Sequence, residues 1–234
     1  LSCVRASEEE RDPEKQPEKV NNAQRVLKES LSASFGIGLN PEALTTVAHE
    51  PWEEIIRVSR LHRCESMLLG LTNLNEKSEE RIEHVMNRVD SDVVVLRTTD
   101  MWRLSEVKKI LVPVRGAGVQ DELLARLLGS ICRKTNAEVT FLKIVPEDAT
   151  WQKTDKSRKA LFQIAEDQVP NGQFKVVVVK SNNVSEEIIS HAEESDLMIV
   201  GLQRFGRRRK EFGKLPLYIA QQTKCPLLMI SRGR

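Results

Sequence analysis

The stretch from Lys108 to Gly116, KKILVPVRG, constrains the fold of this chain more than any other. It is a short apolar run that ends at a glycine, and such a run is typical of a buried β-strand. The residues over Asp121–Thr135 that follow place leucine, isoleucine and cysteine at the three- and four-residue spacing of one helix face. A buried strand followed by an amphipathic helix opens a βαβ unit, so the sequence predicts an α/β protein.

The remainder of the second half continues this alternation. Further strands are predicted at Ala137–Val145, Lys175–Lys180, Leu197–Leu202 and Pro226–Ser231. Further helices are predicted near Ser157–Val169, after the capping residue Asn183, and in a short segment near Pro216. The valine run inside Lys175–Lys180 indicates a sheet that is covered on both faces. Residues Lys108–Arg234 are therefore expected to form a five-stranded parallel sheet with four helices.

The first half repeats part of the same plan. Glu53–Ile56 (EEII) precedes Met67–Leu71 (MLLGL), as Glu186–Ile189 (EEII) precedes Met198–Leu202 (MIVGL). Similar segments at this separation indicate a duplicated domain. Strands of the first half are predicted at Leu1–Arg5, Leu44–Ala48, Met67–Leu71 and Val93–Arg97. The predicted domains are residues 1–99, which lack an opening strand and helix, and residues 100–234, so we expect the natural protein to contain sequence before Leu1.

Composition and residue spacing exclude several classes of protein. The 234 residues carry a formal net charge of +2, which does not favour binding to a bulk polyanion. No apolar run in the sequence approaches the roughly 18 residues of a membrane-spanning helix. The four cysteines form no Cys-x-x-Cys pair and the four histidines show no metal-ligand spacing. Zinc and haem are therefore not expected, and the thiols are predicted to be buried.

The order of strands and helices, with Gly201 after the fourth strand of the second half, resembles the universal stress protein family. The resemblance covers the second half well and the first half in part. It implies an α/β fold with two universal-stress-protein-like (adenine nucleotide alpha hydrolase-like) parallel-sheet domains, the first incomplete at its N-terminus. It also implies an ATP site beyond the carboxyl ends of the strands, with an acidic residue after the first strand and a glycine pattern after the fourth strand.

The chain departs from the ligand motif of that family at several positions. The resemblance maps the acidic residue onto Arg115, which reverses the charge. The other positions map onto Val145, Gly201, Gly206, Gly213 and Lys214. The last of these is a lysine where the family has a hydroxyl residue. We therefore expect ATP to bind weakly or not at all, and no cofactor, with ATP or another adenine nucleotide as the alternative.

A basic segment occupies the place of the lost phosphate loop. It carries five cationic residues: Arg204, Arg207, Arg208, Arg209 and Lys210. Such a concentration of charge is typical of a solvated loop, and it also fits an anionic ligand, an acidic surface of a partner or the anionic inner leaflet of a membrane. Phe205 is the single aromatic residue of the segment, so a nucleic-acid partner is not expected.

The resemblance implies two alternative functions, and an enzyme that uses the basic segment for phosphate chemistry is the third function considered. We expect a non-catalytic cytosolic regulatory domain of a membrane transporter, because degenerate pairs of this kind occur in the tails of amino-acid permease-like carriers, cation-chloride cotransporters and sodium/proton antiporters. Its partner would then be the transmembrane transporter domain of the same polypeptide, on the cytoplasmic side of an inner or plasma membrane. The alternative is a free-standing tandem universal stress protein that binds an adenine nucleotide. An enzyme is not expected, because the sequence offers no pairing of a nucleophile with a base.

The final strands of the two halves predict how the chain is assembled. Asp92–Arg97 and Pro226–Ser231 are apolar enough to be buried on both faces, and exposed edges of that kind promote aggregation. We expect the two halves to pack against each other through these strands. We further expect two chains to form a homodimer.

Overall fold

The fold is that of a computed structural model, which describes residues 2–5, 17–36, 38, 41–71, 73–99, 101–115, 122–169, 172–205 and 209–233. The chain divides into two compact units, Leu1–Cys64 and Glu65–Arg234. The boundary predicted between residues 1–99 and 100–234 is based on the similarity of the two halves of the sequence, whereas these units are defined by packing. The two predicted domains therefore stay a prediction.

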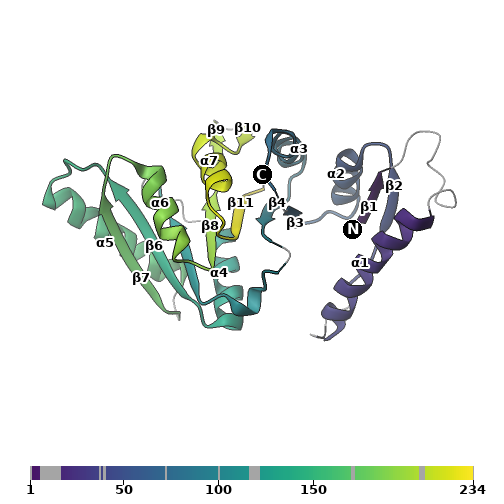
Figure 1. The fold of residues 1–234 in the computed structure, drawn as a ribbon, viewed down its shortest axis with the longest axis horizontal. Coiled ribbons are helices and arrows are strands. Elements are labelled where there is room, and N and C mark those ends of the chain that lie inside the picture. The colour runs from purple at the N-terminus through teal and green to yellow at the C-terminus, as the bar shows by residue number, and fades with distance from the viewer. Residues whose placement is uncertain are drawn as a thin grey trace. The chain divides into compact units, whose positions relative to one another are not determined.

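The first unit combines a two-stranded parallel sheet with two helices (Figure 1). Its elements are β1 (Ser2–Arg5), α1 (Pro17–Gly36), β2 (Thr45–Ala48) and α2 (Pro51–Leu61). Strand β1 pairs with β2, so that Ser2 lies opposite Thr45. Helix α2 begins at a proline, which is favoured in the first turn, and buries Ile56 and Val58. Both strands that the sequence predicts for this unit are confirmed.

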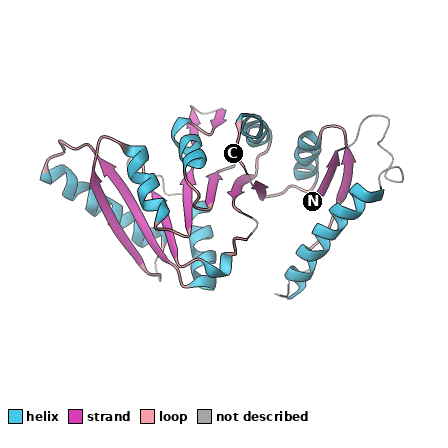
Figure 2. Ribbon diagram, viewed as in Figure 1, coloured by secondary structure: helices cyan, strands magenta, loops and turns pink. Residues whose placement is uncertain are grey.

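The second unit is built on a seven-stranded sheet with the order β3-β4-β11-β8-β5-β6-β7 (Figure 2). The strands of this sheet are β3 (Ser66–Leu71), β4 (Asp92–Arg97), β5 (Lys109–Pro113), β6 (Glu138–Val145), β7 (Phe174–Lys180), β8 (Leu197–Gly201) and β11 (Leu227–Ser231). The helices are α3 (Glu76–Arg88), α4 (Glu122–Thr135), α5 (Trp151–Gln168), α6 (Val184–Glu193) and α7 (Lys214–Gln222), and a 3-10 turn covers Leu104–Glu106.

Five strands of this sheet, β7-β6-β5-β8-β11, run parallel to one another, which confirms the prediction for the second half. Strand β5 is central, between β6 and β8. Helices α4 and α5 pack together on one face of these strands, and α6 and α7 pack together on the other (Figure 1). The core includes Ile110, Val112, Val139, Phe141 and Leu161, all at most 2% exposed.

Two elements differ from the prediction. Helix α5 begins at Trp151 rather than near Ser157, because the Thr150 hydroxyl accepts a hydrogen bond from the Lys153 N–H and caps an earlier start. Strand β7 is an edge strand, and its valines are half-buried rather than covered on both faces. The predicted cap of α6, Asn183, is confirmed.

The two halves of the sequence meet where β4 pairs with β11 in antiparallel orientation. This confirms the expectation that the halves pack through their final strands. Val95 lies opposite Met229 in the middle of the pairing, and both side chains are fully buried. The pairing therefore closes two apolar strand edges that would otherwise face water.

The register of β3 against β4 repeats that of β8 against β11. Met67 pairs with Val93, and Met198, its counterpart in the second half, pairs with Leu227. When each residue of one half is exchanged for its counterpart in the other half, the β4–β11 pairing stays the same. The Val95–Met229 pair lies at its centre. The two strand pairs are thus related by a local two-fold symmetry.

A buried arginine lies at one end of this pairing. Arg97 is 8% exposed, and its Nη2 donates a hydrogen bond to the Cys225 carbonyl at 2.6 Å. Burial lowers the pKa of the Arg97 guanidinium and raises the pKa of the Cys225 thiol to about 12. Cys225 is buried as predicted and Cys132 is half-buried. The prediction of buried thiols is wrong for Cys64, which is exposed because it lies in the turn between α2 and β3.

Replacement of Leu228 by lysine tests the pairing of the two halves. Leu228 is 7% exposed and lies opposite Leu96. The change places a charge inside an apolar pairing, so we expect the free energy of unfolding, measured by urea denaturation, to fall by about 3 kcal/mol or more. Leu61→Lys is the control, because Leu61 is 65% exposed, and it should change that free energy by less than about 0.5 kcal/mol. Equal stabilities of the two variants would contradict the role of the pairing.

Candidate nucleotide-binding edge

Three of the predicted site residues meet at the carboxyl ends of adjacent strands. Arg115 follows β5, Val145 ends β6 and Gly201 ends β8. Because β8, β5 and β6 are neighbours in the sheet, these positions lie along one edge. Ligands of open parallel sheets bind at this edge, so the structure places the three residues where the sequence predicts a site.

The charge at this edge favours an anion over a nucleoside. Arg115 is exposed, and the preceding Val114 donates its N–H to the Leu142 carbonyl at 2.8 Å, which holds the backbone against β6. A guanidinium donates hydrogen bonds and accepts none, so a ribose hydroxyl finds no acceptor on Arg115. Val145 is 4% exposed, which makes it part of the core and leaves little surface for an adenine ring.

Gly213 and Lys214 form the start of α7. Gly213 is the N-cap, and its φ of +75° lies in the left-handed region that glycine adopts without strain. The helix has no side-chain cap, because glycine offers no acceptor to the N–H groups of the first turn. Lys214 is exposed at the first helical position, where it adds a second positive charge. Gly206 lies outside the described residues.

A hairpin that the sequence does not predict lies between β8 and α7. Its strands are β9 (Gln203–Phe205) and β10 (Arg209–Glu211), which pair in antiparallel orientation. The sequence of this segment offers a glycine as a signal for a turn. Because the residues on either side of it do not alternate between apolar and polar, this glycine does not distinguish a hairpin from a loop. Arg207 and Arg208 lie outside the described residues, as do the side chains of Arg204, Arg209 and Lys210. The role of the basic segment therefore stays a prediction.

Phe212 anchors the end of this hairpin. Its side chain is fully buried, and its backbone N–H donates to the Glu83 carboxylate of α3 at 2.9 Å. Glu83 belongs to the first half of the sequence and Phe212 to the second, so the hydrogen bond joins the two halves beside the candidate edge. Neither residue is predicted from the sequence, because a contact between residues so distant in the chain leaves no local pattern.

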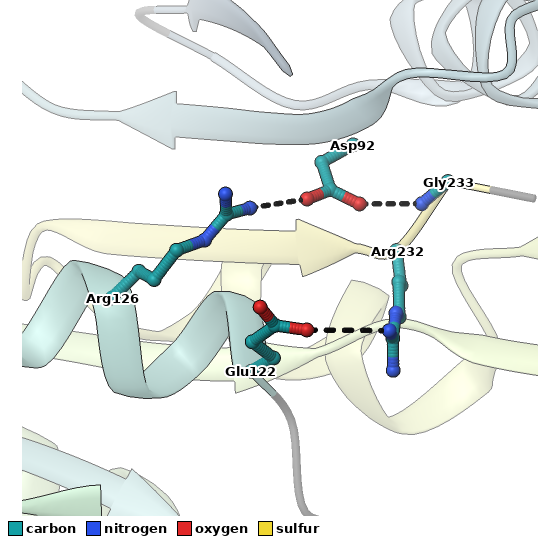
Figure 3. Close-up of polar contacts among 5 residues, drawn as sticks. All are labelled: Asp92, Glu122, Arg126, Arg232 and Gly233. Atoms are coloured by element: carbon teal, nitrogen blue, oxygen red, sulfur yellow. Dashed lines mark hydrogen bonds and ion pairs between the residues drawn. The ribbon is translucent and has the colours of Figure 1, made fainter. Parts of the chain in front are cut away.

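A polar junction lies at the carboxyl end of β11 (Figure 3). The Asp92 carboxylate accepts hydrogen bonds from Arg126 on α4 and from the Gly233 N–H, each at 2.7 Å. Arg232 lies 3.5 Å from the Glu122 carboxylate. These residues border a cleft of about 520 Å³, but their charges are paired with one another. The junction thus joins β4, α4 and the C-terminal segment rather than presenting a reactive group.

Two further findings bear on the chemistry of the chain. Among the described residues, no group of three or more His, Cys, Asp or Glu side chains is placed to hold a metal ion. No helix in this part of the chain combines the length and the hydrophobicity that a membrane-spanning segment requires. At the candidate edge, Arg115 supplies hydrogen-bond donors and positive charge.

Two substitutions of Glu83 test the anchor of the hairpin. Glu83→Ala removes the acceptor of the Phe212 N–H, and a buried donor without a partner costs about 1–3 kcal/mol. We expect trypsin to cleave the basic segment of this variant roughly ten-fold faster, since cleavage follows the population of the opened state. Glu83→Gln keeps a carbonyl acceptor and should be cleaved at nearly the rate of the unmodified chain. If both variants are cleaved equally fast, the hydrogen bond is not the anchor.

Solved structures share this fold over nearly the whole chain. A universal stress protein from Archaeoglobus fulgidus is 15% identical, with a TM-score of 0.63, over 95% of this chain and 80% of that chain. The cytoplasmic domain of a prokaryotic cation chloride cotransporter is 13% identical, with a TM-score of 0.60, over 94% of this chain and 81% of that chain. At these identities the likeness shows the fold.

No curated protein matches the sequence. The family model of the universal stress proteins matches residues 106–231, which is more than half of the chain. The matched segment extends from the 3-10 turn before β5 to the end of β11, and so contains the five parallel strands and their four helices. The chain therefore belongs to the universal stress protein family.

Proposed function

We propose that the chain is a non-catalytic regulatory domain on the cytosolic side of a membrane transporter, formed by two universal-stress-protein-like halves in tandem. Such a domain acts through the surfaces that it packs against its partners rather than through chemistry. Its partner is the transmembrane part of the same polypeptide, and two copies form a homodimer.

The proposal rests on one observation. The fold of the second half is complete, whereas the edge of the sheet where a ligand would bind differs from what the family resemblance implies. The five-stranded sheet of the second half and its four helices are all present. At the edge of that sheet, Arg115 stands where the family resemblance implies an acidic acceptor. The hairpin after β8 is held by the bond between Phe212 and Glu83. A retained core without the ligand residues favours a regulatory role over nucleotide turnover.

Two observations support the tandem arrangement and the transporter assignment. The β4–β11 pairing maps onto itself when the two halves are exchanged, as expected for two copies of one plan. The likeness to the cytoplasmic domain of the cotransporter extends over 94% of this chain. It supports the transporter assignment by analogy of fold, and the likeness to the archaeal universal stress protein makes a free-standing protein the alternative.

Calorimetric titration with Mg-ATP tests the altered edge. We expect a Kd weaker than about 1 mM, because Arg115 offers no acceptor to a ribose hydroxyl. Gly201→Ala is a suitable probe of the edge, since a Cβ added at Gly201 meets no atom within 4 Å and should leave the fold intact. Micromolar binding of ATP that Gly201→Ala abolishes would contradict the loss of the nucleotide site.

The transporter assignment is tested on the natural full-length gene product. We expect the polypeptide that carries residues 1–234 to sediment with membranes and to stay there after an alkaline wash, since insertion of a membrane-spanning helix is effectively irreversible. In that protein, replacement of Arg207, Arg208 and Arg209 by alanine is expected to change the transport rate at an unchanged melting temperature. Recovery of the whole product in the soluble fraction would instead support the free-standing alternative.

A further inference from the structure

Helix α5 packs on β6 and β7 at one end of the seven-stranded sheet (Figure 1). The other end of the sheet is β3, to which Leu1–Cys64 is joined. Leu161 and Ala165 are buried on the inner side of the helix. Its outer side carries two large aromatic side chains, Trp151 and Phe162, which are 76% and 48% exposed. Large apolar side chains gathered on an exposed surface indicate a site of contact with a partner.

Four residues of α5 form one stripe along this outer side. They are Trp151, Asp155, Arg158 and Phe162, at intervals of four, three and four residues. Such intervals keep side chains on one side of an α-helix, so the stripe extends over about three turns. Asp155 forms an ion pair with Lys159 at 2.8 Å, whereas Arg158 is exposed and forms no ion pair among the described residues. The stripe thus has an aromatic ring at each end, with a carboxylate and a guanidinium between them.

This stripe is complementary to itself when two copies of α5 lie antiparallel. A two-fold axis between residues 156 and 157 places Trp151 opposite Phe162 of the second copy, and Asp155 opposite Arg158 of the second copy. The reverse contacts form at the same time, because a two-fold axis makes every contact twice. The pairing therefore contains two aromatic contacts and two ion pairs. The charges of the stripe favour a second copy as the partner, since each charge meets its opposite.

The final strands of the two halves do not offer a second copy an alternative surface. Strand β4 lies between β3 and β11, and strand β11 lies between β4 and β8. Both edges of each strand are therefore paired within the chain. A homodimer requires another surface.

We propose that α5 is the homodimer interface of this chain, with two copies packed antiparallel through Trp151, Asp155, Arg158 and Phe162. Burial of the aromatic side chains drives the association, because exposed ion pairs contribute little. The ion pairs select the antiparallel direction, since a parallel pair would place Asp155 opposite Asp155 of the second copy. The inference rests on the homodimer of the proposed function, whose surface it names, and it is independent of the transporter assignment.

Sedimentation equilibrium of residues 1–234 tests the interface. We expect a dimer with a Kd of about 10–100 µM, because one helix from each copy buries less surface than a standard interface. Trp151→Lys should weaken dimerisation at least about ten-fold at an unchanged melting temperature, since Trp151 is exposed in the monomer. Met101→Lys is the matched control, because Met101 is 83% exposed on a turn outside α5, and it should leave the Kd unchanged.

Two charge variants test the antiparallel register. Arg158→Glu places carboxylates opposite each other and Asp155→Lys places cations opposite each other, so each variant alone should dimerise at least about ten-fold more weakly. A mixture of the two variants should form heterodimers at nearly the original Kd, because every charge then faces its opposite. Lys153→Glu is the control on the same helix. Lys153 lies about 200° around α5 from Trp151, so this change should leave the Kd unchanged.

Each way in which the inference can fail has its own result. A dimer that none of these variants weakens would assign the homodimer to another surface and overturn the inference alone. Charge variants that weaken the dimer but do not associate when mixed would overturn the antiparallel pairing of α5. A chain that stays monomeric up to about 1 mM would overturn both the inference and the homodimer of the proposed function.

Discussion

The antiparallel pairing of β4 with β11 holds the other elements of the second unit in position. It joins strands from the two halves of the sequence, and the side chains of Val95 and Met229 at its centre are fully buried. The gain is hydrophobic, because two apolar edges leave water together. The bonds of Asp92 to Arg126 and of Glu83 to Phe212 also join the two halves.

The same pairing shapes the candidate ligand edge. It brings α3 close to the connection between β8 and α7, where Glu83 accepts the N–H of Phe212. In the family resemblance, backbone N–H groups after the fourth strand bind phosphates. An N–H that is bonded to a carboxylate of its own chain is not available to an external anion. Arg115 lies after β5 at the same edge, where the family resemblance implies an acidic residue.

Much of the fold could be predicted because strands and helices differ in the period of their apolar residues. Strand β5 and helix α4 occur where the sequence predicts them, since each keeps one period over its length. The start of α5 could not be predicted in this way, because its cap at Thr150 is polar and precedes the apolar stripe. Arg115, Val145 and Gly201 could be assigned to one edge, because the carboxyl ends of neighbouring parallel strands coincide.

Local patterns in the amino-acid sequence were sufficient for the α/β class and for the apolar final strands. They were not sufficient for the β9–β10 hairpin, the Glu83–Phe212 bond or the antiparallel direction in which β4 meets β11. Burial periodicity is a property of neighbouring residues and can be read from them directly. The partner of a strand edge depends on contacts between distant residues, whose free energy is set only when all the packed elements are in place.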